Sequence, residues 1–161
     1  GDDSVSGLKG DDILDGGAGD DRIWGKEDDD RLLGSEGDDR LLGESGSDTL
    51  NGGTGDDSLF GGDGNDILAG DQGADKLNGG QGSDTFVFAA GDDATDIIAD
   101  FMNGEDRIDL AGFGGLSFDD LAISAEGDDC IIDLTAHGGG RIVLRRVNAS
   151  DLDPSDFLFA R

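Results

Sequence analysis

The stretch Gly52-Gly53-Thr54-Gly55-Asp56-Asp57-Ser58-Leu59-Phe60 is the clearest copy of a nine-residue unit, Gly-Gly-x-Gly-x-Asp-x-apolar-x. Stepping by nine residues in either direction from Asp57 reaches an aspartate every time. The ten aspartates of this series are Asp3, Asp12, Asp21, Asp30, Asp39, Asp48, Asp57, Asp66, Asp75 and Asp84. Each is followed two residues later by an apolar side chain. A single match is typical of an ordinary acidic turn, but ten in strict register indicate a repeat architecture over residues 1–87.

Glycines mark the turn of each unit. One lies five residues before nearly every aspartate, and another lies two residues before it, except where Asp28 takes that position. Glycine permits the positive φ of a tight turn, and aspartate tolerates it better than most residues. The apolar residue and its two neighbours predict a minimal three-residue strand whose middle side chain faces inward. Because one unit buries almost nothing alone, stacking is needed to bury a continuous apolar row.

This nonapeptide pattern resembles the RTX (repeats-in-toxin) family of secreted bacterial proteins. The resemblance covers residues 1–87 and implies an all-β fold, a parallel β-roll or right-handed β-solenoid with two nonapeptides per coil. A β-rich segment over residues 88–161 is then expected to cap the roll. The resemblance also implies calcium, held by the ten repeat aspartates and by loop carbonyls of two stacked turns. Those carbonyls are expected near Gly10, Gly17, Gly19, Gly37, Gly46, Gly53, Gly55, Gly62, Gly64, Gly73, Gly80 and Gly82.

The charge of the repeat supports a cation between the turns. Stacking two units per coil places Asp39 over Asp57 and Asp57 over Asp75. Two carboxylates about 4 Å apart repel by roughly 4 kcal/mol at an effective dielectric near 20. Flexible turns with hard oxygen ligands favour calcium over zinc or copper. Roughly eight calcium ions are expected for such an array.

The composition sets limits on the partners. The 161 residues include 39 acidic and 11 basic side chains, a formal charge of −28, and only 34% are hydrophobic. Without a counter-ion this composition lies near that of disordered chains. The acidity argues against nucleic acids and anionic membranes as partners, and no apolar run is long enough for a spanning helix. The single cysteine, Cys130, cannot form an internal disulfide and is expected to be buried as a small apolar residue.

Larger side chains occupy the outward positions of the odd-numbered units. They are Arg22, Trp24, Arg40, Leu42, Phe60 and Lys76. Trp24, Leu42 and Phe60 are eighteen residues apart, so a two-unit coil stacks them on one outer face. One interpretation is a seam covered by the C-terminal segment or by an upstream domain, and the other is a polysaccharide-binding strip. The covered seam is favoured, because exposed apolar rows usually mark contacts.

Residues 88–161 differ in character from the repeats. Turn and strand signals predict short strands, one helical turn (117–121) and a strand meander. The predicted strands are 85–88, 96–101, 106–110, 122–125, 129–134, 141–147 and 156–160. Asp96, Asp100, Asp106 and Asp109 are candidates for a further calcium site, and solvated strand ends are the alternative for these four.

The segment after the repeats is similar to the region that follows them in secreted proteases, lipases and alginate epimerases of the family. Residues 156–160 are similar to the acidic-then-apolar end that such proteins present to the type I secretion machinery. The alternative for that end is a closing edge strand. Gly1 falls at the fourth position of a unit, so we expect the chain to be the C-terminal part of a longer protein.

The sequence contains no catalytic motif of the His-Glu-x-x-His or Gly-x-Ser-x-Gly type, and its only histidine, His137, precedes three glycines. We therefore expect a non-catalytic module of a secreted, extracellular or cell-surface protein. It should be disordered at low calcium and fold on binding calcium outside the cell. The alternative is a polysaccharide-binding module, alginate-like in its ligand, of a secreted carbohydrate-active enzyme.

Overall fold

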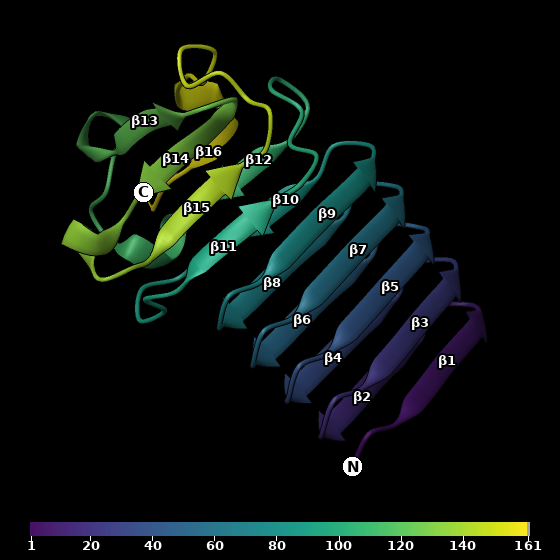
Figure 1. Ribbon diagram of the computed structural model, residues 1–161. Helices are drawn as coiled ribbons and strands as arrows, with labels where there is room; N and C mark the ends of the chain where they lie inside the picture. Colours follow the sequence, from purple (N-terminus) through teal and green to yellow (C-terminus); the bar gives the residue numbers. More distant parts are fainter. Residues whose placement is uncertain (161) are drawn as a thin grey trace.

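The computed structural model describes residues 1–160; Arg161, the last residue of the predicted cap, lies outside the described residues. Each nonapeptide contributes one strand, and successive strands alternate between two sheets that face each other (Figure 1). Two units therefore complete one coil. Within each sheet the repeat strands pair in parallel, so that Leu41 lies opposite Leu59. The predicted all-β parallel solenoid with two nonapeptides per coil is confirmed.

The strands fall into two sheets with the following spatial orders. The nine-stranded sheet contains β1 (Ser4–Lys9), β3 (Arg22–Glu27), β5 (Arg40–Ser45), β7 (Ser58–Asp63), β9 (Lys76–Gln81), β11 (Thr95–Ile98), β15 (Arg141–Leu144), β14 (Asp129–Asp133) and β13 (Ala122–Glu126). The seven-stranded sheet contains β16 (Phe157–Leu158), β12 (Arg107–Asp109), β10 (Thr85–Val87), β8 (Ile67–Gln72), β6 (Thr49–Thr54), β4 (Arg31–Glu36) and β2 (Ile13–Ala18).

The core of the roll is the double row of apolar residues that follow the repeat aspartates. From Ile23 to Phe86 every member of this row is fully buried. The two sheets supply alternate members, so each coil adds one side chain from either side. Burying a side chain of this size contributes about 1.5–3 kcal/mol. Because a coil buries its apolar pair only against the next coil, the units are stable only as a stack.

The repeat strands are longer than predicted, and the three-residue estimate is wrong. β7 spans six residues and includes both Gly61 and Gly62. Parallel pairing continues past the apolar triplet, and Glu44 lies opposite Gly62. At this second glycine position φ is positive even where the residue is not glycine, as at Ser35 (85°) and Glu44 (78°). The backbone conformation is therefore imposed by the stack and not by the local residue.

Replacing Ser35 with glycine should stabilise the calcium-loaded protein. A non-glycine residue held at an unfavourable φ costs on the order of 1–3 kcal/mol, but Ser35 also donates a hydrogen bond to Asp15. We expect Ser35→Gly to raise the free energy of unfolding by about 1 kcal/mol, measured by chemical denaturation in saturating calcium. The reverse change Gly53→Ser is the control and should destabilise, because a Cβ there would clash with the Ser35 carbonyl. A loss of stability in Ser35→Gly would contradict the strain argument.

The parallel stacking continues beyond the repeats. β11 pairs with β9 and β15, and β12 pairs with β10 and β16, all in parallel. β11 and β12 thus form a sixth coil, and β13, β14 and β15 add the predicted antiparallel meander. The helical turn is present as Phe118–Asp120, with a capping box from Ser117. The last strand is shorter than predicted, because a 3₁₀ turn over Pro154–Asp156 occupies its beginning.

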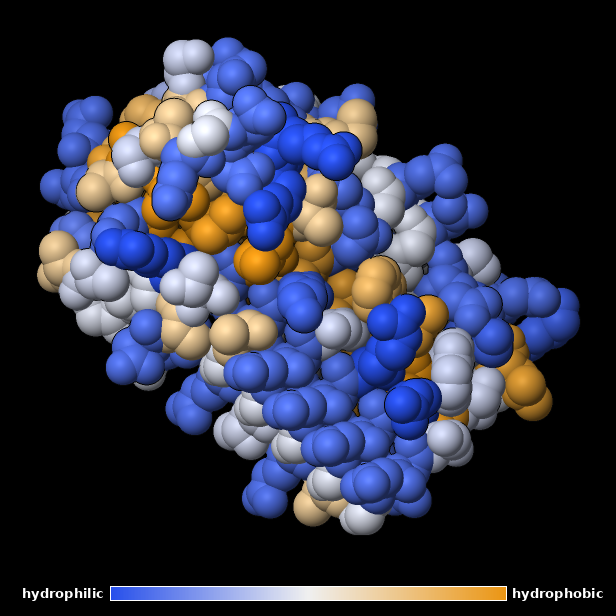
Figure 2. Space-filling model, viewed as in Figure 1, coloured by the Kyte–Doolittle hydropathy of each residue, from blue (hydrophilic) through white to orange (hydrophobic). Residues whose placement is uncertain are grey.

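Phenylalanine side chains close the C-terminal end of the core. Phe86 of the last repeat packs against Phe101, with ring centroids 6.3 Å apart. Phe157 packs against Phe118 at 5.4 Å and against Phe159 at 5.9 Å. Figure 2 shows hydrophilic residues over most of the visible face, with hydrophobic residues gathered where β11 and β15 lie. The roll thus ends in a well-packed apolar cap.

Two further predictions concern the burial of Cys130 and the absence of a membrane-spanning helix. Cys130 is fully buried and free, as predicted, and burial raises the pKa of its thiol to about 11. The thiol therefore stays protonated near neutral pH. In the part of the chain that the structure describes, no helix is long and apolar enough to cross a membrane.

Candidate metal sites

The repeat aspartates form two columns, one along each edge of the roll. The backbone N–H of Asp39 donates to Oδ1 of Asp57, and the N–H of Asp57 donates to Oδ1 of Asp75, both at 2.8 Å. The same bond links every repeat aspartate to the one eighteen residues later, from Asp3 to Asp84. Odd-numbered units supply one column and even-numbered units the other. The predicted stacking of Asp39, Asp57 and Asp75 is therefore present in the structure.

The second oxygen of these carboxylates has no hydrogen-bond partner among residues 1–160. These buried Oδ2 atoms belong to Asp21, Asp30, Asp39, Asp48, Asp57, Asp66, Asp75 and Asp84. Each of the eight side chains is at most 3% exposed. A buried polar atom without a partner is costly, and an ionised one more so. Each of these oxygens therefore calls for a proton or a cation.

Burial strongly disfavours the ionised form of the central aspartates. It raises the pKa of Asp57 and Asp66 to about 7, and that of Asp48 and Asp75 to about 6. Neighbouring aspartates raise these pKa values further, whereas the backbone hydrogen bond lowers them. Without a cation, ionisation of the aspartate columns destabilises the folded roll, because the carboxylates are buried and repel one another.

The first glycine of each unit leaves room beside the orphaned oxygen. A Cβ at Gly34 would clash with both Oδ2 of Asp39 and the carbonyl oxygen of Gly52 in the next coil. Gly43 and Gly61 show the same arrangement, with the pairs Asp48 Oδ2–Gly61 O and Asp66 Oδ2–Gly79 O. A carboxylate oxygen and a carbonyl oxygen thus face one common space. Both are hard ligands of the kind calcium prefers, so the residues present fit that ion.

The first-glycine carbonyls were missed in the sequence analysis, which placed the loop carbonyls near other glycines. All twelve glycines named there have positive φ; Gly17, Gly53, Gly62 and Gly80 lie near the ends of strands, and the others lie in the turns. The first glycine does not need positive φ, and what it supplies is space and its own carbonyl oxygen. The signal that could have revealed it is its recurrence five residues before nearly every aspartate.

Side chains alone do not complete a metal site. Within residues 1–160, no three His, Cys, Asp or Glu side chains come together closely enough to hold an ion by themselves. Backbone carbonyls must therefore supply the remaining ligands, as flexible calcium loops commonly do. Asp3, at the N-terminal end of its column, is exposed, and Asp12 is only half-buried.

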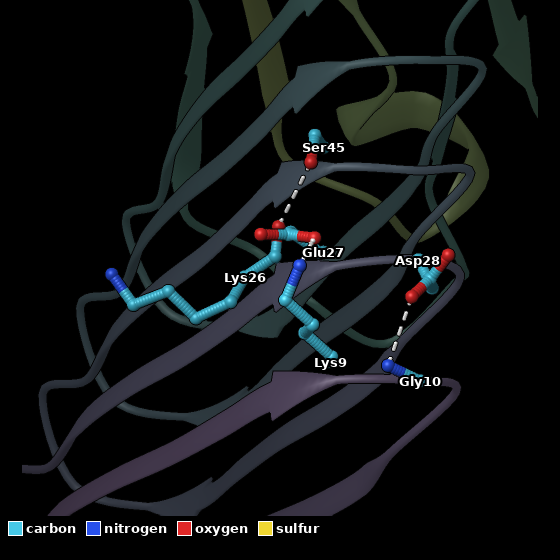
Figure 3. Close-up of polar contacts among 6 residues, drawn as sticks. All are labelled: Lys9, Gly10, Lys26, Glu27, Asp28 and Ser45. Carbon is cyan, nitrogen blue, oxygen red and sulfur yellow. Dashed lines mark hydrogen bonds and ion pairs between the residues drawn. The ribbon is translucent and has the colours of Figure 1, made fainter.

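Asp28 replaces glycine in one turn and links two coils (Figure 3). Its φ is 80°, and its Oδ2 accepts a hydrogen bond from the N–H of Gly10 at 2.9 Å. Beside it, Lys9 forms an ion pair with Glu27, and the Ser45 hydroxyl donates to the carbonyl of Lys26. The exception in the repeat is thus accommodated by side-chain contacts between neighbouring coils.

The four aspartates proposed as one extra site do not come together. Asp96 lies at the end of one column and accepts the N–H of Asp75, whereas Asp106 ends the other and accepts the N–H of Asp84. Asp100 accepts the N–H groups of Gly79 and Gly80, and Asp109 only that of Ala111. The prediction of a single site is therefore wrong, because β11 and β12 belong to opposite sheets.

The outward row of the odd units is in register. Trp24 lies opposite Leu42, and Leu42 lies opposite Phe60. All three are half-buried. The Arg40 guanidinium stands 4.3 Å from the centre of the Phe60 ring. Within residues 1–160, Arg22, Arg40 and Lys76 form no ion pair. The expectation that the C-terminal segment covers this row is wrong, because that segment continues the stack instead (Figure 1).

Acidification should partly replace calcium in holding the roll together. The central aspartates have folded-state pKa values of about 6 to 7, against roughly 3.9 in an unfolded chain. Protonation therefore favours the fold; its contribution is full below about pH 4 and is lost as the pH rises through 6 to 7. In calcium-depleted buffer we expect more β-structure by circular dichroism at pH 5 than at pH 7.5. Asp57→Asn should show a smaller gain, and equal spectra at both pH values would contradict the argument.

Asp57→Ala should damage two neighbouring sites. Asp57 bonds to Asp39 below it and to Asp75 above it, and its Oδ2 faces the space beside Gly52. We expect the calcium midpoint of folding to rise about tenfold or more, equivalent to at least about 1.4 kcal/mol. Asp3→Ala is the matched control, since Asp3 is exposed and has a column neighbour on one side only. Equal midpoints for the two variants would count against the columns as binding sites.

Two buried aspartate columns and the carbonyls beside them define a calcium-binding β-roll. The family model described as the RTX calcium-binding nonapeptide repeat matches the chain in four copies, at residues 1–32, 24–59, 33–68 and 60–94. The chain therefore belongs to the RTX calcium-binding nonapeptide repeat family, which confirms the resemblance seen in the sequence. A comparison with curated proteins finds no match.

Several solved structures are similar to this chain. The AlgE6R3 subunit of the Azotobacter vinelandii mannuronan C5-epimerase is 28% identical, with a TM-score of 0.55, covering 94% of this chain and 81% of that one. The AlgE6R2 subunit of the same enzyme is 26% identical, with a TM-score of 0.51, covering 95% and 92%. The extracellular lipase LipA of Serratia marcescens is 18% identical, with a TM-score of 0.48, covering 89% and 39%.

Proposed function

We propose that this chain is a non-catalytic, calcium-dependent folding module of a secreted protein. The observation that carries the proposal is the set of eight buried carboxylate oxygens without partners, arranged in two columns. Above the raised pKa values of these carboxyls, an arrangement this costly is stable only if a cation compensates the charge. We propose one calcium ion for each of these eight oxygens.

The repeat aspartates and glycines have distinct roles in this account. Each aspartate uses Oδ1 to fix the next coil through a backbone hydrogen bond and presents Oδ2 to the ion. Each first glycine leaves the space open and offers its carbonyl oxygen to the coil before it. Calcium bound there supplies positive charge and coordination between the turns. The aspartates then draw neighbouring coils together, where without the ion they would repel each other.

The negative charge of the chain makes folding depend on whether the chain is in the cytosol or outside the cell. In the cytosol, calcium lies far below the roughly 0.1–1 mM dissociation constants of extracellular modules. Self-repulsion at a formal charge of −28 keeps the chain extended, a form suited to the type I secretion machinery. Outside the cell, each filled site adds RT ln(1 + [Ca]/K) to the stability of the fold. We further propose that residues 156–160 take part in recognition by that machinery.

The position of the calcium midpoint tests this function. Trp24 lies within β3, the strand that leads into the turn containing Asp28 and Asp30, so its fluorescence should report ordering of the roll. We expect a folding midpoint of roughly 0.1–1 mM calcium. Magnesium should substitute poorly, because it demands stricter octahedral geometry and retains its water. A midpoint in the submicromolar range, or equal folding by magnesium, would rule out the secretion-coupled role.

A second candidate function is the binding of an acidic polysaccharide on the outward row. Among residues 1–160, the three cations of the row form no ion pair, and the row adds three stacked apolar side chains in a strongly acidic chain. Arg40 already stacks on Phe60. Guanidinium groups pair well with carboxylates, and aromatic rings contact sugar faces. Uronate polymers match this charge pattern.

A titration at fixed free calcium tests this candidate. Uronate oligomers should change the fluorescence of Trp24, and neutral oligosaccharides of equal length should not. The double variant Arg22→Gln/Arg40→Gln should weaken the response several-fold while leaving the calcium midpoint unchanged. Equal responses of the double variant and the original chain would reject the strip as a binding site.

A further inference from the structure

The sixth coil continues both aspartate columns beyond the repeats. Its backbone register places Ile97 opposite Lys76 and Arg107 opposite Thr85. The N–H of Asp75 consequently donates to Oδ1 of Asp96, and the N–H of Asp84 to Oδ1 of Asp106, each at 3.0 Å. These are the same bonds that join the repeat aspartates to one another. The intervals are 21 and 22 residues instead of eighteen, so the nonapeptide period does not reveal them.

Asp96 and Asp106 are as deeply placed as the repeat aspartates. Each is 4% exposed, and in the coil below them Oδ2 of Asp75 and Oδ2 of Asp84 are buried without partners. At Asp39, Asp48 and Asp66, the orphaned oxygen shares its space with a carbonyl oxygen from the next coil, as Asp39 does with Gly52. For Asp75 and Asp84 the next coil is the one formed by β11 and β12. The repeats alone therefore leave these two positions incomplete.

Two more carboxylates from the sixth coil reach the same turns. Asp92 accepts the N–H of Gly73 at 3.4 Å, along the same edge of the roll as Asp75. Asp100 accepts the N–H groups of Gly79 and Gly80, near the end of β9 and just before the turn that leads to Asp84. Each turn of the fifth coil thus faces two acidic side chains from the segment 92–106. No basic side chain forms an ion pair with them in the part of the chain that the structure describes.

We propose that the last two calcium sites of the roll are shared between the repeats and the sixth coil. Asp75 and Asp96 belong to one, and Asp84 and Asp106 to the other, with turn carbonyls completing each site. The inference rests on the proposed calcium function and places two ligands, Asp96 and Asp106, outside the matched repeat units. The first column ends here, because buried Ile142 lies opposite Asp96 in β15. Calcium binding at these two sites couples the folding of the repeats to the folding of the C-terminal cap.

The competing explanation is that Asp96 and Asp106 only accept the backbone N–H groups of Asp75 and Asp84 and bind no ion. An asparagine retains the Oδ1 acceptor for the N–H of Asp75 or Asp84 but loses the negative charge, and at position 106 it also loses the Oδ2 acceptor for the N–H of Met102. The test is the number of ions bound by Asp96→Asn, by Asp106→Asn and by the double variant, from native mass spectrometry in calcium. We expect one ion fewer for each single variant and two fewer for the double variant. Asp109→Asn is the control and should bind as many ions as the original chain, since Asp109 lies outside both columns.

The calcium midpoint of folding gives a second readout with opposite expectations. If Asp96 only caps a backbone group, Asp96→Asn relieves repulsion and folds at equal or lower calcium; Asp106→Asn also loses the hydrogen bond from Met102, so for that variant the ion count decides. If Asp96 binds the ion, the midpoint of Asp96→Asn rises several-fold, and an Asp96→Asn chain that folds only at raised calcium supports the proposal. An unchanged ion count with an unchanged or lower midpoint overturns the shared sites and leaves the proposed function standing. An original chain that binds no calcium refutes the proposed function itself.

Discussion

Removal of calcium is expected to unfold the whole chain. In excess chelator at pH 7.5, circular dichroism should show a largely disordered spectrum, and millimolar calcium should restore a β-rich one. The reason is that eight buried carboxylate oxygens have no partner within residues 1–160 and a formal charge of −28 opposes compaction. The single cysteine is free and buried, so no disulfide within the chain holds the fold in place of the ions.

The control for this experiment is ionic strength. Added sodium chloride screens exposed charges but cannot enter the buried turns as a divalent ligand, so it should restore little structure. A folded spectrum in chelator at low salt would falsify the linkage between calcium and folding.

Truncation after Val87 is the second change with a large expected effect. The cut keeps all ten repeat aspartates but removes the partners of the fifth coil. Leu77 would lose Ile98, and Phe86 would lose both Ile108 and Phe101. Burying side chains of this size contributes about 1.5–3 kcal/mol each, and the first coil to form has no other partner to order it. We expect folding at the calcium midpoint of the whole chain to be lost.

Removal of one coil from the other end is the matched control. A chain of residues 19–161 loses two strands but keeps the cap, and its new first coil repeats the same exposed end. Its calcium midpoint should change much less than that of the chain cut after Val87. If the chain of residues 1–87 folds at the same calcium concentration as the whole chain, the repeats nucleate themselves and the cap is dispensable.

The repeat was predictable because its signal is periodic. Ten aspartates at a period of nine fix which side chains stack, so the columns of Asp39, Asp57 and Asp75 followed from the sequence. The strand length did not, because pairing across Gly61 and Gly62 is a property of neighbouring coils, and a lone nonapeptide does not show it. The recurrence of the first glycine was visible in the sequence, but the position of its carbonyl beside an aspartate of the neighbouring coil was not.

The C-terminal segment was predictable only as a set of elements. Its strands and helical turn lie near their predicted positions, but nothing periodic indicates that β11 and β12 form another coil. Asp96 and Asp106 looked like members of one cluster because they are close in sequence. The chain crosses from one sheet to the other between them, which sends them to opposite edges. Residues 21 or 22 positions apart lie in adjacent coils here, but this can be known only when the path of the intervening loop is known.

The central claim is that calcium ions lie between the turns along the two aspartate columns. It is tested most directly by a crystal structure from crystals grown in calcium, with anomalous differences recorded at long wavelength. The account predicts two rows of peaks, one along each edge of the roll. Each peak should lie about 2.3–2.6 Å from an aspartate Oδ2 and from a carbonyl oxygen of the next coil. The rows should end beside Asp75 and Asp84, with Asp96 and Asp106 among the ligands there. Aspartate columns without peaks between the turns, in a folded roll at saturating calcium, would contradict the account.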